Sequence, residues 1–433
     1  MVGYIDNKTR TLNEWYYLFK KKHPEFSKKN NNYWEQNIIK FNESYHAIND
    51  PWKYFPIEEF YNNQFILNED AAINLSTYNK LRLNIDCYRL VFINGQFSCT
   101  LSDLNINPWI LKIDNNLNYW NTSKPIRPTM FLYLTEYLSD VVIRITLPEK
   151  KITKKPLYLL YINSGSDTPN ALAMSHSYHY LETGQNTDAY VIEHVVNINE
   201  YAHFSGSRML MSIGNKSKFN HVKLILKNQS SYHISHQDMH INSCSDVHSN
   251  TFVIAGSKFT YHQISSKINY SESSISLNSL TILSERNISN MRTYIEHNNQ
   301  NCSISRQLHK IIASDYSTGI FDGLIKVNPH SIKTDGKMIN NNLLLNKTAS
   351  IYTIPKLEIY SDSVQCNHGS TVGHIDLNHL FYLSTRGISK KDAIKMLIDA
   401  FTIENIKKIQ NLSLQKIIAD KIKNVLTKKI IFL

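Results

Sequence analysis

Two residues near the C-terminal end have side chains suited to binding a transition metal: Cys366 and His368, which are separated by one residue and followed by Gly369. In an extended chain, residues i and i+2 point to the same side, so the sulfur and an imidazole nitrogen can reach one point in space. Both atoms are suitable ligands for iron, copper or zinc. Two ligands do not close a site that needs four. The sequence therefore predicts an open site that another group completes, or one that holds its metal only transiently.

The other histidines and cysteines are weaker candidates for metal binding. His233 and His236 belong to the densest histidine group, yet they point to opposite faces of an extended chain. We expect the histidines of the middle region to lie on a solvated strand face or to be hydrogen-bonded within the wall of the fold: His176, His179, His194, His221, His233, His236, His240 and His262. The remaining cysteines have no ligand partner near them in sequence and are interpreted as structural: Cys87, Cys99, Cys244 and Cys302.

Composition narrows the class of protein. The chain has 433 residues and a formal net charge of +11. Its basic residues are mostly lysines without a compact cluster of arginines and aromatics, so we favour a compositional bias over a nucleic-acid surface. Five scattered cysteines without a Cys-x-x-Cys pair fit a reducing compartment. The sequence shows no apolar signal segment and no run long enough to span a membrane, so it predicts a cytoplasmic protein without membrane or nucleic-acid partners.

The first part of the chain, residues 1–150, is predicted to be a helical and mixed region. Residues 11–48 are expected to be helical, because Trp15, Leu18 and Phe19 fall at i, i+3 and i+4, with Asn13 as the cap candidate. Beyond it, short strands such as residues 90–93 are followed by an Asn-Gly turn. Trp52 is expected to pack in the core of this region rather than to bind a ligand.

The middle part, residues 151–376, is predicted to be a β-rich core. Short runs of alternating apolar residues recur there, broken by Asn, Ser and Gly, and no long amphipathic helix interrupts them. A barrel, a sandwich and a β-solenoid all fit this pattern. Hairpin signals are few, and Asn and Ser recur where corners are expected, so a coil of stacked parallel strands is favoured.

The last part, residues 377–433, is predicted to be helical. Ser389 and Asp392 have the spacing of a capping box, and apolar residues follow at helical spacing from Ile394 to Phe401. A second helix is expected from about Ser413, with an apolar stripe formed by Leu414, Ile417, Ile418, Ile422 and Val425.

Residues 366–373, Cys-Asn-His-Gly-Ser-Thr-Val-Gly, resemble the C-terminal signature of the SufB/SufD family, the scaffold subunits of the SUF iron–sulfur cluster assembly machinery. Glycine after the histidine is typical of the SufD type, whereas SufB proteins have glutamate there. The chain departs from the family pattern at Ser370 and His374. Eight further segments resemble the family in the same order: residues 50–57, 89–96, 155–160, 191–194, 305–310, 321–325, 333–337 and 340–344.

The resemblance implies a mainly β fold: a right-handed parallel β-helix core flanked by N-terminal and C-terminal α-helical regions. It also implies a scaffold without catalytic activity, in agreement with the absence of a P-loop. In the family, the scaffold pairs with SufB through the β-helix, and the ABC-type ATPase SufC docks on the C-terminal helices. The SUF complex then assembles clusters where the scaffold subunits meet.

For the site, the resemblance implies a role for His368 in building a nascent cluster, with Cys366 as the weaker candidate. Iron, sulfide or a nascent Fe-S cluster would be held transiently and shared with SufB, with no permanent cofactor. The family's docking region corresponds to Arg386, Gly387, Asp392 and Met396. The sequence leaves open whether the chain forms a homodimer or a heterodimer, and whether it contacts a flavin bound by the complex.

Two other classes of function are disfavoured by the sequence. A β-helix carbohydrate-active enzyme needs clustered carboxylates, and the acids of the middle region are few and isolated. A basic RNA-binding protein needs stacking aromatics interleaved with arginine on one face, and no such cluster is present.

Overall fold

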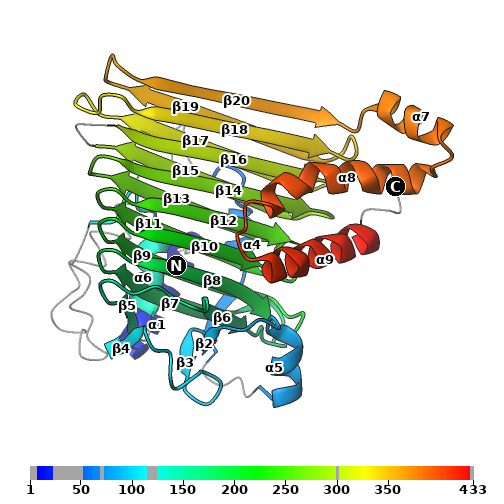
Figure 1. Cartoon of the computed structure of the whole chain (residues 1–433). Helices are drawn as coiled ribbons and strands as arrows, with labels where there is room; N and C mark the ends of the chain where they lie inside the picture. Colours follow the sequence, from blue (N-terminus) through cyan, green and yellow to red (C-terminus); the bar gives the residue numbers. More distant parts are fainter. Residues whose placement is uncertain are drawn as a thin grey trace.

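A computed structural model describes residues 7–22, 52–68, 73–114, 124–139, 141–254, 256–298 and 302–429. Two ten-stranded sheets face each other across a shared interior (Figure 1). The chain alternates between the sheets strand by strand, and from β5 to β20 all neighbours within a sheet pair in parallel. The predicted parallel β-helix is therefore confirmed, and the barrel and the sandwich are excluded.

The first sheet contains, in spatial order, β19 (Ser350–Ile359), β17 (Thr318–Val327), β15 (Ile288–His297), β13 (Phe259–Ile268), β11 (Tyr232–Ile241), β9 (His203–Ile213), β7 (Ala171–Thr183), β5 (Val142–Leu147) and β4 (Ile110–Asp114), with β1 (Gln64–Leu67) paired to the start of β7. The second sheet contains β20 (Gln365–His374), β18 (Asp335–Leu344), β16 (Ser303–Ala313), β14 (Ser273–Leu283), β12 (Asp246–Ile254), β10 (Lys218–Ile225), β8 (Asp188–Asn197), β6 (Leu157–Asn163), β2 (Tyr88–Ile93) and β3 (Gln96–Ser98).

The N-terminal end of the β-helix is closed by antiparallel strands. Strands β2 and β3 form a hairpin whose turn residues, Asn94 and Gly95, have φ of 50° and 87°, as the Asn-Gly signal predicted. Strand β4 pairs antiparallel with β5. Ile106 and Trp109 are buried against the interior cluster at this end, so apolar side chains seal it.

Serines stack at one corner of successive turns. The main-chain N–H of Thr187 donates to Ser217 Oγ at 3.1 Å, that of Ser217 to Ser245 Oγ at 3.3 Å, and that of Ser245 to Ser273 Oγ at 3.4 Å. Each hydroxyl satisfies a main-chain donor of the turn before it, where the backbone leaves the sheet. This is the physical reason for the recurring Ser in the sequence of the core.

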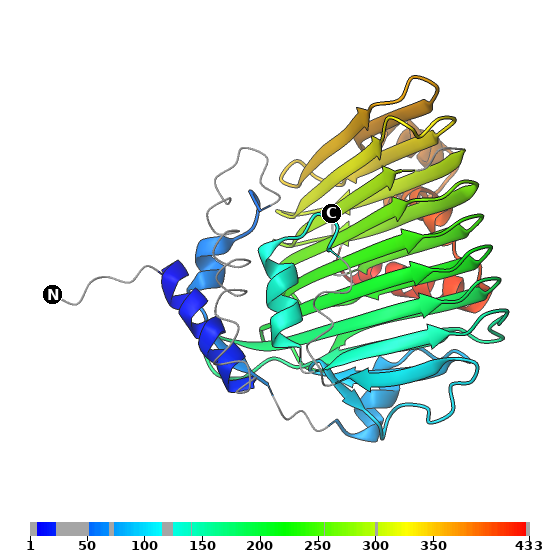
Figure 2. The same cartoon turned by 90° about the vertical axis from the view of Figure 1, so that its left-hand side faces the viewer.

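Helices α1 (Asn7–Lys22), α4 (Ile57–Tyr61) and α6 (Met130–Leu138) lie on the outer face of the first sheet (Figure 2). Trp52 packs there on Tyr261, with ring centroids 4.6 Å apart, which confirms its role in the core. The expected cap at Asn13 is wrong: the helix already begins at Asn7, where an Arg10–Glu14 pair at 3.6 Å supports the first turns. Residues 23–48 of the expected helix lie outside the described part of the chain.

Helices α5 (Leu75–Leu81), α8 (Lys390–Ile406) and α9 (Leu412–Lys429) cover the outer face of the second sheet (Figure 1). Ser389 is confirmed as the N-cap of α8, because its Oγ accepts from the Asp392 N–H at 3.1 Å, while the Asp392 carboxylate accepts from the Ser389 hydroxyl at 2.6 Å. The second helix begins at Leu412, one residue before the expected start, and Asn411 Oδ1 accepts from the Leu414 N–H at 2.9 Å. Leu414, Ile418 and Ile422 are buried against the sheet.

Two polar side chains, Lys310 and Asn405, anchor α8 to the sheet. Lys310 Nζ, on β16, donates to the Phe401 carbonyl at 2.9 Å and to Glu404 Oε2 at 2.6 Å. The Asn405 amide donates to the carbonyl of Ser279 at 2.9 Å, on the neighbouring strand β14. Helix α8, like α9, is therefore part of the folded core.

The interior is not uniformly apolar. Glu193 is fully buried there and accepts hydrogen bonds from His221 Nε2 at 2.8 Å and from Lys223 Nζ at 3.1 Å. Burial alone would raise the pKa of the Glu193 carboxyl, but Lys223 and His221 outweigh burial and hold that pKa well below its usual range. A carboxyl of this kind stabilises the fold as long as it stays ionised.

We therefore expect acid to weaken the interior specifically through Glu193. The unfolded carboxyl takes up a proton at a higher pH than the folded one, so the free energy of unfolding falls as pH is lowered below the carboxyl's ordinary range. Urea unfolding at several pH values should show a steeper loss below about pH 5 in the wild type than in a Glu193→Gln/Lys223→Met variant, which removes the pair together. Equal pH slopes in the two proteins would contradict this role.

Candidate metal site

Cys366 and His368 lie on β20, the last strand of the second sheet, and β19 is the last strand of the first. Within the described residues, each of these strands pairs on one side only, β20 with β18 and β19 with β17. The end of the interior between them is uncovered in that part of the chain, and of the ten residues of β20 only Cys366 is partly buried. The site is an open end with two free strand edges.

The two residues share one face of β20. Cys366 aligns with Gly336 of β18, and His368 aligns with Met338, which is fully buried in the interior cluster. Cys366 itself packs against that cluster, so the shared face is the one directed toward the interior. The strand thus brings a thiol and an imidazole to the same side of the open end, as their spacing predicted.

The thiol and the imidazole differ in their surroundings. Cys366 is half-buried, and burial raises the pKa of its thiol. A methyl group at position 336 would come within 3.1 Å of Cys366 Sγ, so Gly336 leaves the sulfur its space. His368 is exposed. Since a metal binds cysteine as the thiolate, the raised pKa disfavours Cys366 as a ligand, whereas the His368 side chain is accessible from solvent.

The rim of the open end combines hydroxyls with apolar side chains. Thr353 Oγ1 of β19 and Ser370 Oγ of β20 lie 2.8 Å apart and join the two strands across the rim. Ile351 and Leu357 pack against the interior cluster from β19. On β20, Val372 is 43% exposed. A partner that covers this end would bury apolar surface around the two ligands.

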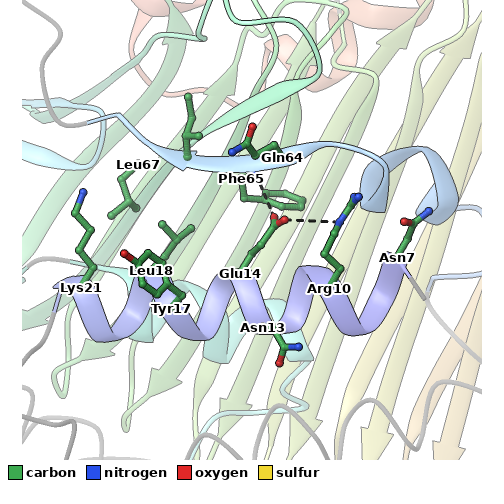
Figure 3. A pocket seen from close by; sticks show the side chains of 11 residues that line it. Asn7, Arg10, Asn13, Glu14, Tyr17, Leu18, Lys21, Gln64, Phe65 and Leu67 are labelled. Atoms are coloured by element: carbon green, nitrogen blue, oxygen red, sulfur yellow. Dashed lines mark hydrogen bonds and ion pairs between the residues drawn. The ribbon is translucent and has the colours of Figure 1, made fainter. Parts of the chain in front are cut away.

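No group of three His, Cys, Asp or Glu side chains that could hold a metal ion is found among the described residues. Grooves are found both beside the start of β20, where Asp335, Asp362 and Gln365 line one, and at places away from it. One of about 740 Å³ runs between α1 and β1, where Glu14 accepts from the Phe65 N–H (Figure 3). Within the described residues, Cys366 and His368 supply two ligands at most, and a four-coordinate metal at this end needs further ligands beyond them.

A short helix, α7 (Leu377–Thr385), follows β20 and was not foreseen as a separate element. Asp376 caps it by accepting from the Asn378 N–H at 2.8 Å, a signal that the sequence carried. The helix projects from the body (Figure 1), and none of its residues is buried. Leu377 and Phe381 are 76% and 72% exposed, so α7 presents apolar surface beyond the end of β20 that lies opposite Cys366 and His368.

The residues predicted for partner docking lie in and after the turn between α7 and α8. Arg386 ends α7, and Gly387 has a φ of 80°, which glycine adopts without strain. The carboxylate of Asp392 accepts from the Ser389 hydroxyl at 2.6 Å, so it already has a local role at the helix start. Met396 is 49% exposed on α8 and is free to contact a partner.

The histidines of the core do not lie on a solvated face. His176, His179, His233 and His236 are almost completely buried. His233 and His236 do point to opposite sides: His233 Nδ1 lies 2.9 Å from Ser205 Oγ, whereas His236 Nε2 lies 2.8 Å from Thr129 Oγ1 near α6. Their place inside a wall that is covered on both faces explains the burial, which sequence alternation alone did not reveal.

Among the helices that the structure describes, none has the length and apolar character of a membrane-spanning segment.

Known proteins resemble this chain along most of its length. Residues 162–401 match the family described as SUF system FeS cluster assembly, SufBD core domain. The chain is 34% identical over 400 residues to the iron–sulfur cluster assembly protein SufD of Escherichia coli (strain K12), which covers 92% of this chain and 93% of that protein. It is 24% identical over 390 residues to an iron–sulfur cluster assembly SufBD family protein of Synechocystis, covering 86% of this chain and 85% of that protein. This chain therefore belongs to the SufB/SufD family of the SUF iron–sulfur cluster assembly system, on its SufD side.

Proposed function

We propose that this chain is a non-catalytic scaffold subunit that pairs through its open end with a SufB-type subunit and helps to assemble iron–sulfur clusters where the two meet. His368 supplies a ligand to the nascent cluster, Cys366 contributes less, and the partner supplies the remaining ligands. Iron and sulfide are the cargo of this site, held transiently. An ABC-type ATPase of the SufC kind docks on the C-terminal helices and hydrolyses the ATP.

One observation carries the proposal: an incomplete ligand pair stands at an unpaired end of the β-helix. Free strand edges expose main-chain donors and acceptors that favour pairing with another strand. In the part of the chain that the structure describes, the terminal strands β19 and β20 present such edges, and the same end offers apolar residues such as Val372. A second scaffold seated there would satisfy the edges and would complete the ligand set in one step.

The incomplete ligand set also suits release of the product. A cage of four thiolates would hold a cluster as a permanent cofactor. Here the thiol of Cys366 has a raised pKa and the imidazole of His368 is exposed. Both features weaken the hold of this chain on a cluster, as a scaffold that hands its cluster on requires.

The exposed side of α8 is proposed as the ATPase-docking surface. Met396 and Ile403 are seven residues apart, so they lie on one face of the helix, and they are 49% and 42% exposed. Because Lys310 and Asn405 fix α8 to β14 and β16, a movement of the docked ATPase is passed to the β-helix itself.

Replacing His368 by alanine should abolish cluster formation while the protein stays folded. The side chain is exposed, so the free energy of unfolding should change by about 0.5 kcal/mol or less. Iron and sulfide bound to the purified complex, and complementation of a strain that depends on this pathway, are the measurements. His374→Ala, an exposed histidine on the same strand, is the matched control and should keep activity, and Cys366→Ala should be impaired less than His368→Ala. A normal cluster yield from His368→Ala would remove the residue from the mechanism.

Placing a charge on the rim should block pairing with the second scaffold. Val372→Glu would bury an unpaired carboxylate in the interface, and we expect at least a tenfold weaker association, equivalent to about 1.4 kcal/mol or more. Analytical ultracentrifugation with the SufB-type partner measures it, and the same experiment without partner shows whether two copies of this chain pair instead. Unchanged association would place the interface elsewhere.

Charges on α8 should separate ATPase docking from scaffold pairing. Met396→Glu/Ile403→Glu is expected to weaken binding of the ATPase at least tenfold, about 1.4 kcal/mol, while pairing at the open end persists. The double variant is preferable to deletion of the helices, because their removal would uncover the apolar outer face of the second sheet. Tyr270→Glu, at an exposed corner remote from α8, is the control. Full ATPase affinity in the double variant would refute this placement.

A further inference from the structure

Each polar group that contacts Glu193 directly has a hydrogen-bond partner. Glu193 Oε1 accepts from His221 Nε2, and the other nitrogen of that ring lies 2.8 Å from Ser249 Oγ, a hydroxyl that can donate or accept. Glu193 Oε2 accepts from Lys223 Nζ, which also donates to Ser235 Oγ at 2.9 Å. Each of these groups therefore has a partner of the right kind.

Several side chains next to this network have buried polar atoms without a hydrogen-bond partner. Gln237 donates its amide to Glu193, which leaves the Gln237 Oε1 acceptor buried and without a partner. Neither nitrogen of His179 has a partner with good hydrogen-bond geometry, and the main chain of Tyr178 offers the ring only a weak contact. The Tyr161 hydroxyl is likewise buried without a partner. These three residues and Glu193 are all at most 5% exposed.

Their positions place these unpartnered atoms in one region. Tyr161 and His179 stack with ring centroids 5.6 Å apart, and Gln237 contacts Glu193 directly. His179 and Gln237 align with the same residue of β9, Met209, one from each side, and Met209 belongs to the interior cluster. All four residues thus line the interior between β6 and β11.

The chemistry of the three groups calls for a ligand that both donates and accepts. Burial lowers the pKa of His179 to about 4, so its ring is neutral, with one donating and one accepting nitrogen. The Tyr161 hydroxyl donates and Gln237 Oε1 accepts. Buried polar groups in native proteins are nearly always paired, and a site with two to four polar partners is what buried water occupies.

We propose that the middle turns of the β-helix enclose a hydrated chamber, in which ordered water molecules bridge Gln237, His179 and Tyr161 around the Glu193–Lys223 pair. The chamber lies beneath the part of the second sheet that α9 covers, since Ile192 and Val222 from the same strands pack in one cluster with Leu414 and Ile418. Water molecules can change their hydrogen-bond partners when the surrounding strands shift, whereas close-packed apolar side chains resist such a shift. The scaffold is therefore more deformable at these turns than an apolar core would be.

The test uses the whole protein and the residue with two unpartnered nitrogens. Oxygen-17 magnetic relaxation dispersion detects long-lived internal water in solution, and its amplitude should fall in His179→Phe and stay unchanged in Ile295→Val, which trims the apolar part of the interior. The melting temperature of His179→Phe should also fall, because the bridging water loses partners. In a dry interior the same change would remove two unsatisfied nitrogens from a ring stack and would raise the melting temperature.

A lower melting temperature of His179→Phe could also result from the larger size of phenylalanine. A high-resolution crystal structure of the wild type distinguishes this explanation from the loss of bridging water. Water density within hydrogen-bond distance of His179 and Gln237 Oε1 is the expected result. An empty chamber, or direct pairing of Tyr161, His179 and Gln237 with other protein groups, would overturn the proposal.

Discussion

Parallel stacking of strands in register is the constraint on which the rest of this structure depends. Every strand inside the β-helix has its main chain satisfied by the turns before and after it. The two ends of such a stack cannot be satisfied in this way. At the N-terminal end, the antiparallel strands β3 and β4 and the buried Trp109 close the structure. At the other end, β19 and β20 keep free edges within the described residues, and this is the end that carries Cys366 and His368.

The two outer faces of the β-helix are covered by different sets of helices. On the first sheet, aromatic residues such as Trp52 and Phe131 pack α1, α4 and α6 against the strands. On the second, α8 and α9 bury the outward side chains of the strands and are further held by Lys310 and Asn405. An ATPase docked on α8 would therefore act on a surface that is continuous with the core, two strands away from β20 in the same sheet.

The interior combines an apolar column with buried polar groups at the level of Glu193. A buried ion pair costs desolvation that its own attraction only partly offsets. In this protein the carboxylate is also bound by His221 and Gln237, so the pair is held by several donors at once. The stability of the middle turns therefore depends on the ionisation of Glu193, whereas the corners depend on the hydrogen bonds of Ser217, Ser245 and Ser273.

The sequence by itself determined the class of fold, the helical ends and the placement of Cys366 and His368 on one face of a strand. Strand alternation, recurring Ser at corners, the capping box at Ser389 and the two-residue spacing of Cys366 and His368 are local signals, and each acts over a few residues. The family resemblance of residues 366–373 added the functional context. Only the tertiary structure decided that β20 is terminal, that α7 stands free, and that the core histidines are buried on either side of the wall. Those features depend on which strands become neighbours, and contacts between residues distant along the chain leave no periodic pattern in the sequence.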